Sequence, residues 1–471
     1  MTRSFNEITN EFPGYDDLAE PQKWVPLNLR ERLTIPHIIG ICCSMLAYQI
    51  AYSVEFSLGT PIMTRLGIKS TLVSVIWMSG PLSGFIVQPV IGTISDVCKS
   101  KFGRRRPFIL CGALGIIIGF LLIFFTEQIA DGNTNLAIGI FVVALLETNI
   151  AIHVLQGPSR ALIGDLVPAR QQVFANTIGS IMLGVAAIVT NLIGGLKLAQ
   201  YTNGVLNDEK LVFICGMILI VISVSITLLC AKEEEVKRMQ EKRNPFLEIW
   251  RAFKHMPRPI FRIALVYFFS WMAYYPFNIE CTDFFGYDIF QGRSTGDDHL
   301  IEKYNNGVCH GMIVIAVSNC LVLIYSPFQE IMVKKLGMKL TYAISQIIEA
   351  VCLVIMIFVT NKWALLGILA PLGISSTIFN SVPFAIVGLS VQPEQMGCYM
   401  GVLNSFAVVG QQISSFLLVS GAGAIFHNKA PIIGLGSVFA VISAILCYWI
   451  VIPKDDSSTL EPLTPSSSYY E

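Results

Sequence analysis

The sequence predicts an all-α membrane protein in which twelve transmembrane helices form two six-helix bundles. Hydrophobic residues make up 54% of the 471 residues and charged residues 14%, whereas a soluble domain has about 25% charged residues. Twelve apolar stretches are each long enough to cross the hydrocarbon layer, which takes about 20 helical residues, and a charged segment divides them six and six. This composition implies a lipid bilayer as the surroundings. Because basic and acidic residues both number 32, the charge indicates no nucleic-acid partner.

Taken in order, the predicted elements are joined mostly by short connections. Residues 1–34 are polar and are expected to be a cytosolic N-terminal tail. The apolar spans are predicted at 36–59, 71–95, 107–126, 136–165, 172–196, 211–230, 260–281, 308–329, 341–360, 363–389, 399–423 and 432–453. The N-terminal bundle therefore covers 35–230 and the C-terminal bundle 260–453, with a charged cytosolic linker at 231–259. Residues 454–471 are serine-rich and acidic, which predicts a disordered cytosolic C-terminal tail.

Basic segments predict the orientation of the chain. The connector between the second and third spans carries Lys99, Lys101 and Arg104–Arg106, and cation-rich loops are retained in the cytosol. The linker also has an excess of lysine and arginine, whereas the loop 282–307 is acidic and falls on the opposite face. Both termini are therefore expected in the cytosol. We expect the plasma membrane rather than a vacuolar or other organelle membrane.

The two halves of the chain share a short pattern at equivalent connectors. Asp96 lies seven residues before Gly103, with arginines following, and Glu330 lies seven residues before Gly337, with lysines around it. Both segments join the second and third spans of their half. This echo predicts two parallel six-helix repeats that face each other across a central cavity.

The basic connector also predicts a charge clamp. Asp96 ends the second span, Asp165 ends the fourth, and Arg104 and Arg105 open the third. Carboxylates at these positions can pair with the arginines, hold one conformation, and separate when the halves move. The alternative is that the arginines only fix the topology or contact lipid phosphates.

Several motifs resemble those of a known family. The stretch Asp96–Ile109 is similar to the loop of the plant sucrose carriers and of their animal relatives, the proton-associated sugar transporters, within the major facilitator superfamily. Similar segments elsewhere are Leu58–Pro61, Trp77–Gly84, Gln156–Leu162, Trp271–Phe277 and Met400–Asn404. The resemblance implies the major facilitator fold and secondary active transport of a sugar by a protein that is not an enzyme.

Polar residues within the apolar spans are the candidate site residues, because ionisable groups in lipid are costly and usually line a cavity. Tyr52 and Glu55 share one helical face in the first span. A carboxylate beside a tyrosine suits a protonatable group that also accepts hydrogen bonds from sugar hydroxyls. Glu55 matches a glutamate of the animal relatives. The alternative is a structural glutamate at the membrane edge.

The fourth span places Asn149, His153, Gln156 and Arg160 on one face at helical spacing. Arg160 matches the arginine that the sucrose carriers use at the substrate, and a guanidinium offers a rigid fork of donors to vicinal hydroxyls. The plant carriers have an aspartate where this chain has Asn149. Proton coupling then rests on Glu55 or His153, or it is weakened. His153 is either a proton relay or a neutral packing residue.

The second half contributes uncharged amides that suit a polyol, since each sugar hydroxyl both donates and accepts. The same amides also serve ordinary packing between helices. With this alternative open, the expected substrate-binding residues are Tyr52, Asn149, Gln156, Arg160, Asn278, Asn380 and Asn404.

These expectations describe a proton-coupled symporter of sucrose or a related disaccharide or hexose that works by alternating access. Its partners are a small-molecule sugar, a proton and the bilayer. No cofactor or metal is expected, because the sequence has neither a Gly-x-x-x-x-Gly-Lys-Ser/Thr phosphate loop nor a Cys/His cluster with metal-ligand spacing. Two alternatives remain. One is an uncoupled facilitative sugar carrier, which Asn149 favours. The other is a non-transporting sugar sensor, against which the modest tails and linker argue.

Overall fold

The computed structural model confirms the all-helical class and the twelve spans. It describes residues 27, 30–96, 98–168, 171–202, 206–233, 250, 253–254, 256–390, 393–426 and 428–452. Within these residues, twelve helical stretches are long and apolar enough to cross a membrane, from Ile35–Arg65 to Lys429–Trp449. The predicted C-terminal tail, most of the N-terminal tail and most of the linker lie outside the described residues.

The first half of the chain forms a bundle of helices from α1 to α9. Its elements are α1 (Ile35–Cys42), α2 (Ser44–Arg65), α3 (Ser70–Trp77), α4 (Ser79–Asp96), α5 (Arg106–Phe124), α6 (Thr126–Ala130), α7 (Thr134–Leu166), α8 (Gln172–Gly195), the 3-10 turn η3 (Leu198–Thr202) and α9 (Asp208–Cys230). Two asparagines cap long helices in this bundle. The side-chain oxygens of Asn133 and Asn207 accept main-chain N–H groups at the starts of α7 and α9, which satisfies donors that the helix itself leaves free.

The second half forms a bundle from α11 to α18. Its elements are α11 (Arg258–Phe284), the π-helical turn η4 (Phe285–Ile289), α12 (Asp298–Phe358), α13 (Lys362–Leu369), α14 (Leu372–Phe379), α15 (Val382–Ser390), α16 (Pro393–Ser414), the π-helical segment η5 (Ser415–Gly421), the 3-10 turn η6 (Ala422–Ala424), α17 (Lys429–Gly434), α18 (Gly436–Leu446) and the 3-10 turn η7 (Cys447–Trp449). Element α12 holds two spans, which Gly337 separates with a non-helical φ of 78°.

The internal echo of the sequence has a counterpart in backbone geometry. Gly103 has a φ of 112° and Gly337 a φ of 78°, and both values lie in the left-handed region that favours glycine. Each glycine lies between the second and third spans of its own half. The same conformational requirement therefore recurs at the same place in both halves.

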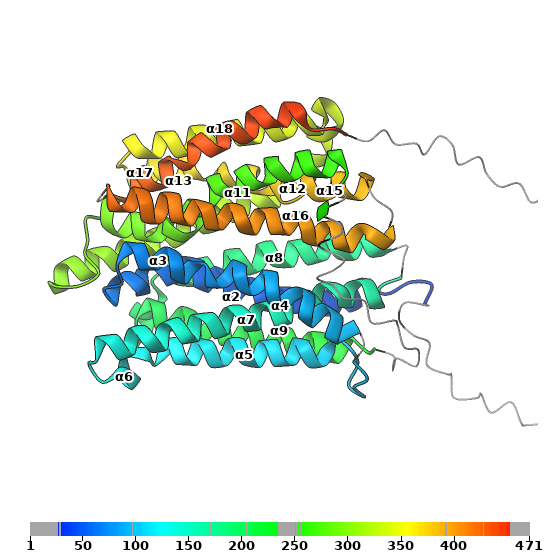
Figure 1. The fold of residues 1–471 in the computed structure, drawn as a ribbon. Helices are drawn as coiled ribbons and strands as arrows, with labels where there is room; N and C mark the ends of the chain where they lie inside the picture. The colour runs from blue at the N-terminus through cyan, green and yellow to red at the C-terminus, as the bar shows by residue number, and fades with distance from the viewer. Residues whose placement is uncertain are drawn as a thin grey trace, which may run out of the picture.

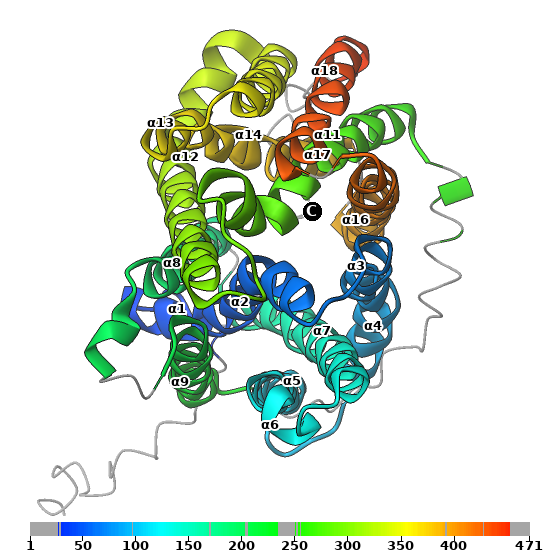
Figure 2. The ribbon, with the colours of Figure 1, turned by 90° about the vertical axis from the view of Figure 1, so that its left-hand side faces the viewer.

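The helices run side by side along a common direction, as Figure 1 shows. Seen along that direction, α1–α9 form one group and α11–α18 the other (Figure 2). The groups meet where α2 packs against α11, α8 against α12 and α4 against α16. One large buried apolar cluster lies in the N-terminal bundle and extends to Tyr275 and Ile279 of α11, and a second lies within the C-terminal bundle. Leu114, Val143 and Phe358 are among many exposed large apolar side chains. Such an extensive exposed apolar surface suits contact with lipid.

The two ends of the molecule differ in the segments that they carry. The linker end carries residues 98–105 and Ala231–Glu233, and the acidic-loop end carries η4 and the loop 290–297. At the acidic-loop end, hydrogen bonds join the two bundles. Thr60 Oγ1 donates to the carbonyl of Ile279 at 2.5 Å, and Thr282 Oγ1 donates to the carbonyl of Ser57 at 2.7 Å.

Gly112 tests the packing of α5 against α7. A Cβ at this position would lie 2.7 Å from the main-chain N of Leu155 and 2.8 Å from the carbonyl O of Ala151. Because main-chain atoms cannot rotate away, Gly112→Ala is expected to lower the free energy of unfolding by about 1–3 kcal/mol. Thermal unfolding of purified protein in detergent measures this. The control is Gly139→Ala on α7, where the added Cβ meets nothing within 4 Å; equal melting temperatures for the two variants would contradict the packing argument.

Candidate functional site

Glu55 of α2 and Asn149 of α7 meet inside the N-terminal bundle. Asn149 Nδ2 donates a hydrogen bond of 2.7 Å to Glu55 Oε1, and the same amide donates to the carbonyl of Leu145 at 2.9 Å. Both side chains are buried. The second carboxylate oxygen, Glu55 Oε2, has no hydrogen-bond partner among the described residues. A carboxylate therefore lies beside Asn149, and it comes from α2.

His153 lies one turn further along α7, and both of its ring nitrogens have partners. Nε2 is 3.1 Å from the carbonyl O of Gly80, which can only accept, so this nitrogen carries the proton. Nδ1 lies 3.0 Å from Gln88 Nε2, which can donate to it, and 3.2 Å from Gln156 Oε1, which can accept from it. The ring lies so close to α4 that a Cβ on Gly84 would be 2.7 Å from its Cε1. These contacts fix the orientation of the His153 ring.

Tyr52 and Gln156 belong to the same network. Gln156 Oε1 accepts from Gln88 Nε2 at 2.6 Å, and the Tyr52 hydroxyl lies 3.4 Å from both Gln156 Oε1 and His153 Nδ1. The Tyr52 ring stacks on Phe56 with centroids 5.9 Å apart, and Phe56 stacks on Trp77 at 5.5 Å. A row of aromatic faces thus adjoins the hydrogen-bonding groups predicted from the sequence.

Arg160 lies two turns beyond His153 and faces the other bundle. Its Nε donates to the Tyr48 hydroxyl at 3.4 Å. The guanidinium also interacts electrostatically with Tyr52 and with Tyr267, which belongs to α11 of the C-terminal bundle. The Arg160 side chain is solvent-exposed yet flanked by tyrosines of both bundles. It therefore faces the interface between the bundles rather than the lipid.

Tyr275 of α11 is a site residue whose position the sequence did not reveal. It interacts electrostatically with Glu55 across the interface, and its buried hydroxyl has no hydrogen-bond partner among the described residues. From the sequence it is one aromatic among several in the seventh span. The pairing with Glu55 depends on how the bundles dock, which no local pattern encodes.

The predicted site residues of the C-terminal bundle are the three amides Asn278, Asn380 and Asn404. Asn380 donates to the carbonyl of Ser376 in its own helical segment at 2.9 Å. Asn278 on α11 and Asn404 on α16 are half-buried. Within the described residues, no hydrogen bond joins these amides to Arg160.

The arginines of the basic connector form ion pairs with Asp165. Arg104 Nη2 is 2.5 Å from Asp165 Oδ1 and Arg105 Nε is 2.9 Å from Asp165 Oδ2. Arg105 Nη1 also donates to Ser95 Oγ at 2.5 Å. Asp96 ends α4, but its side chain lies outside the described part of the chain. The ion pairs all lie within the N-terminal bundle.

Glu233 is a further partner of these arginines that the sequence did not single out. Its carboxylate accepts the main-chain N–H groups of Arg105 and Arg106 at 3.0–3.1 Å. Burial raises the pKa of the Glu233 carboxyl, although these N–H groups oppose the rise. Gly103 allows the approach, because a Cβ there would lie 2.2 Å from Glu233 Oε2. The acidic run that follows the sixth span was the available signal.

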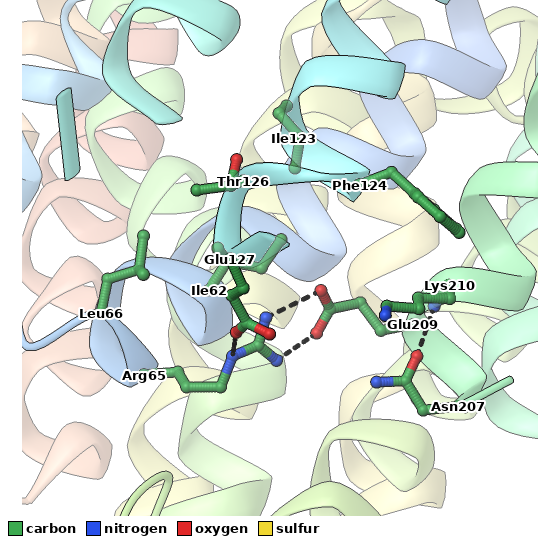
Figure 3. Close-up of a pocket in the computed structure, with 10 residues that line it drawn as sticks. All are labelled: Ile62, Arg65, Leu66, Ile123, Phe124, Thr126, Glu127, Asn207, Glu209 and Lys210. Carbon is green, nitrogen blue, oxygen red and sulfur yellow. Dashed lines mark hydrogen bonds and ion pairs between the residues drawn. The ribbon is translucent and has the colours of Figure 1, made fainter. Parts of the chain in front are cut away.

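A second charged cluster lies at the acidic-loop end of the N-terminal bundle (Figure 3). Arg65, the last residue of α2, pairs with Glu209 of α9 at 2.5 Å and with Glu127 of α6 at 3.1 Å. A small pocket lies beside these side chains. The three pairing residues come from three separate helices, so they tie the ends of α2, α6 and α9 together.

Within the described residues, no group of three or more His, Cys, Asp or Glu side chains is arranged to hold a metal ion. The side chains at the interface offer hydrogen bonding, proton binding and aromatic stacking.

Comparisons with known proteins place this arrangement in a family. The sequence profile of the Major Facilitator Superfamily matches residues 38–294. Sucrose transport protein SUC4 of Arabidopsis thaliana is 30% identical over 424 residues, which cover 80% of this chain and 82% of the relative. Sucrose transport protein SUT5 of Oryza sativa subsp. indica is 26% identical over 459 residues, covering 86% and 85%.

Solved transporter structures have the same fold. A mutant of the nucleoside transporter NupG aligns with a TM-score of 0.64 at 15% identity, covering 88% of this chain and 99% of that one. A D-xylose-proton symporter aligns with a TM-score of 0.58 at 13% identity, covering 88% and 96%. These homologues are transporters and not enzymes. By its sequence profile, its relatives and its twelve spans, the chain belongs to the major facilitator superfamily of membrane transporters, in the group that contains the plant sucrose transport proteins.

Proposed function

We propose that this protein carries sucrose or a related disaccharide or hexose across a membrane together with a proton, by alternating access. The observation that carries the proposal is the contact between Glu55 and Asn149, on the same face of α7 as Arg160. The names of the relatives support a sugar as the substrate.

The sugar binds between the bundles in this proposal. Arg160 lies between the bundles, because two of its flanking tyrosines come from α2 and the third from α11. Its guanidinium can donate to vicinal hydroxyls of a sugar bound there. Tyr52 and Gln156 add hydroxyl and amide groups, and the aromatic row through Phe56 offers apolar faces for the ring. Asn149, Asn278, Asn380 and Asn404 remain proposed contacts.

Glu55 is the proposed proton carrier. Its carboxylate is buried, has one oxygen without a partner, and makes no ion pair with a described residue. Burying an unpaired charge costs far more than burying a neutral acid, so the group is suited to binding a proton when the site closes. His153 positions Tyr52 and Gln156, because its hydrogen bonds already use both ring nitrogens.

The clamp is proposed to control the linker end, which we place in the cytosol of a plasma-membrane protein with both termini inside. The Asp165 pairs with Arg104 and Arg105 join the α4–α5 connector to the end of α7. Because these pairs lie within one bundle, they stiffen that bundle as it moves against the other. Asp96 is the proposed additional anion.

Uncoupled sugar transport is the second candidate. It is favoured by Asn149, since an amide stands where the resemblance to the plant carriers implies an aspartate. The Asn149 amide can neither bind nor release a proton at this position. If Glu55 does not carry a proton either, sugar transport is uncoupled from the proton gradient. Uptake that ignores a pH gradient would select this candidate.

Arg160→Ala tests the substrate role. Labelled sucrose, maltose and glucose are offered to proteoliposomes with and without an inward proton gradient. Because hydrogen bonds from a charged donor contribute about 1.5–3 kcal/mol each, we expect uptake of the transported sugar to fall by about 10- to 100-fold. Arg160→Lys should be intermediate, since lysine lacks the planar fork. Normal uptake by a folded Arg160→Ala protein would refute the assignment.

Glu55→Gln tests the coupling role. The amide keeps the shape of the side chain but binds no proton, so exchange of sugar across the membrane should persist while accumulation driven by the proton gradient is lost. Glu147→Gln on α7 is the matched control, because Glu147 is a half-buried membrane glutamate two residues from Asn149 in the sequence. If Glu55→Gln still accumulates sugar against its gradient, Glu55 is not the proton carrier.

Asp165→Asn tests the clamp. The substitution removes both ion pairs to the connector, so transport should slow while the KM for sugar stays unchanged, because the binding residues lie elsewhere. Asp131→Asn, in the exposed α6–α7 turn, is the control. A large change in KM with an unchanged maximal rate would assign Asp165 to substrate binding instead.

A further inference from the structure

The segment Ile279–Asp283 of α11 closes the acidic-loop end against α2. Its main chain accepts a hydrogen bond from Thr60 at Ile279, and its Thr282 hydroxyl donates to the main chain of Ser57. Both threonines are buried. Trp77 Nε1 donates to Thr60 Oγ1 at 3.2 Å, which fixes that hydroxyl. We call these two inter-bundle hydrogen bonds the crossing bonds.

The same segment carries two buried carboxylates that no step described so far uses. Glu280 and Asp283 are both 0% exposed. Lys429, the first residue of α17, places its Nζ 2.8 Å from Glu280 Oε2 and 3.0 Å from Asp283 Oδ2. The Tyr304 hydroxyl donates to Asp283 Oδ1. Glu280, Asp283 and Lys429 are called the gate cluster below.

The gate cluster has an excess of negative charge. It holds two carboxylates and one ammonium, and Glu280 Oε1 has no hydrogen-bond partner among the described residues. Asp288 of η4 adds a further acidic group nearby, although its Oδ2 accepts the main-chain N–H of Ala430 at 2.7 Å.

The other titratable groups around the cluster do not offset this charge. On α12, Tyr304 is neutral and packs on Tyr287, with ring centroids 5.0 Å apart, and His310 packs on Phe285 at 5.3 Å. From the N-terminal bundle, Arg65 interacts electrostatically with Tyr304, but it already pairs with carboxylates of its own bundle. The cluster therefore keeps one carboxylate charge more than Lys429 neutralises.

We propose that Glu280, Asp283 and Lys429 form a second proton-binding site, and that a proton bound there stabilises the closed acidic-loop end. Burying a carboxylate without a counter-charge is costly, and the crossing bonds hold the segment that carries both carboxylates against α2. Opening that end lets water reach the carboxylates and relieves the cost. The closed state therefore binds the proton more tightly than the open state, and by linkage the proton favours closure.

This site would make closure depend on the pH of the compartment at the acidic-loop end. A proton taken up there replaces the missing counter-charge and lets Ile279–Asp283 dock on α2. The inference rests on the proposed alternating access, but it involves neither Glu55 nor Arg160. A carrier that moves no sucrose at all would still show the pH-dependent closure.

The test measures closure directly and without sugar. Lys197 and Asn306 lie in contact across the bundles at this end, with Lys197 Nζ 2.5 Å from Asn306 Oδ1. Spin labels are attached to cysteines at these positions at one fixed pH, and their dipolar broadening is then recorded in nanodiscs between pH 5 and pH 8. Singly substituted proteins account for label on native cysteines. Labelling at a fixed pH keeps thiol chemistry out of the comparison.

We expect broadening to increase as the pH falls, with the closed-to-open ratio changing by up to about tenfold per pH unit for one linked proton. Glu280→Gln removes the excess charge and should leave the pair closed at every pH. Lys429→Met adds to the excess charge and should keep the pair open until lower pH. Glu302→Gln, an exposed glutamate of α12 at the same end, should behave like the unsubstituted protein.

Two outcomes would overturn the proposal. One is a Glu280→Gln protein that keeps the original pH dependence, and the other is broadening that decreases as the pH falls. Should Glu280→Gln fail to elute as a monodisperse peak in detergent, Asp283→Asn makes the same charge change and takes its place. Sugar uptake by the same proteins is scored separately, so failure of the sugar assignment and failure of the gate cluster are distinguishable.

Discussion

The hydrogen bond between the Asn149 amide and the Glu55 carboxylate is the interaction on which the interpretation of this transporter depends. It places a carboxylate inside the N-terminal bundle with one oxygen free, and a buried carboxylate is tolerated only when it is neutralised or paired. The surrounding helices are arranged around that constraint. Tyr275 approaches from α11, while α7 presents His153, Gln156 and Arg160 beyond it. The bundles therefore meet around groups that are costly to leave without partners.

Much of the fold could be predicted from the sequence, because lipid imposes length and composition on every span. Twelve apolar stretches, a charged segment between the sixth and seventh, and glycines at equivalent connectors were all visible, and the positive φ of Gly103 and Gly337 agrees with the last. The breaks inside spans were less visible. The spans containing α1 and α2, or α3 and α4, read as continuous apolar runs, since one distorted turn leaves the hydropathy unchanged.

Part of the candidate site could be predicted from the sequence, namely the residues that share one face of a single helix. Helical spacing is enough to put Asn149, His153, Gln156 and Arg160 on one face, so that column was predictable. Contacts between side chains of different helices depend on how those helices pack against one another, which helical spacing does not determine. For this reason Glu233 and Lys429 were not singled out, although each is a charge beside an apolar span. The ion pairs of Asp165 with Arg104 and Arg105 could be predicted because the oppositely charged groups cluster at one membrane edge, where few partners are within reach.

The crossing bonds between α2 and α11 have a consequence for how such carriers diverge. In both, the acceptor is a main-chain carbonyl, that of Ser57 or Ile279, and only the two donors are side chains. Side chains at positions 57 and 279 can therefore drift without loss of the contact, and serine can replace either threonine as donor. Carriers with little sequence in common along these helices can seal the same face of the membrane in the same way, and an alignment of side chains alone would overlook the shared seal.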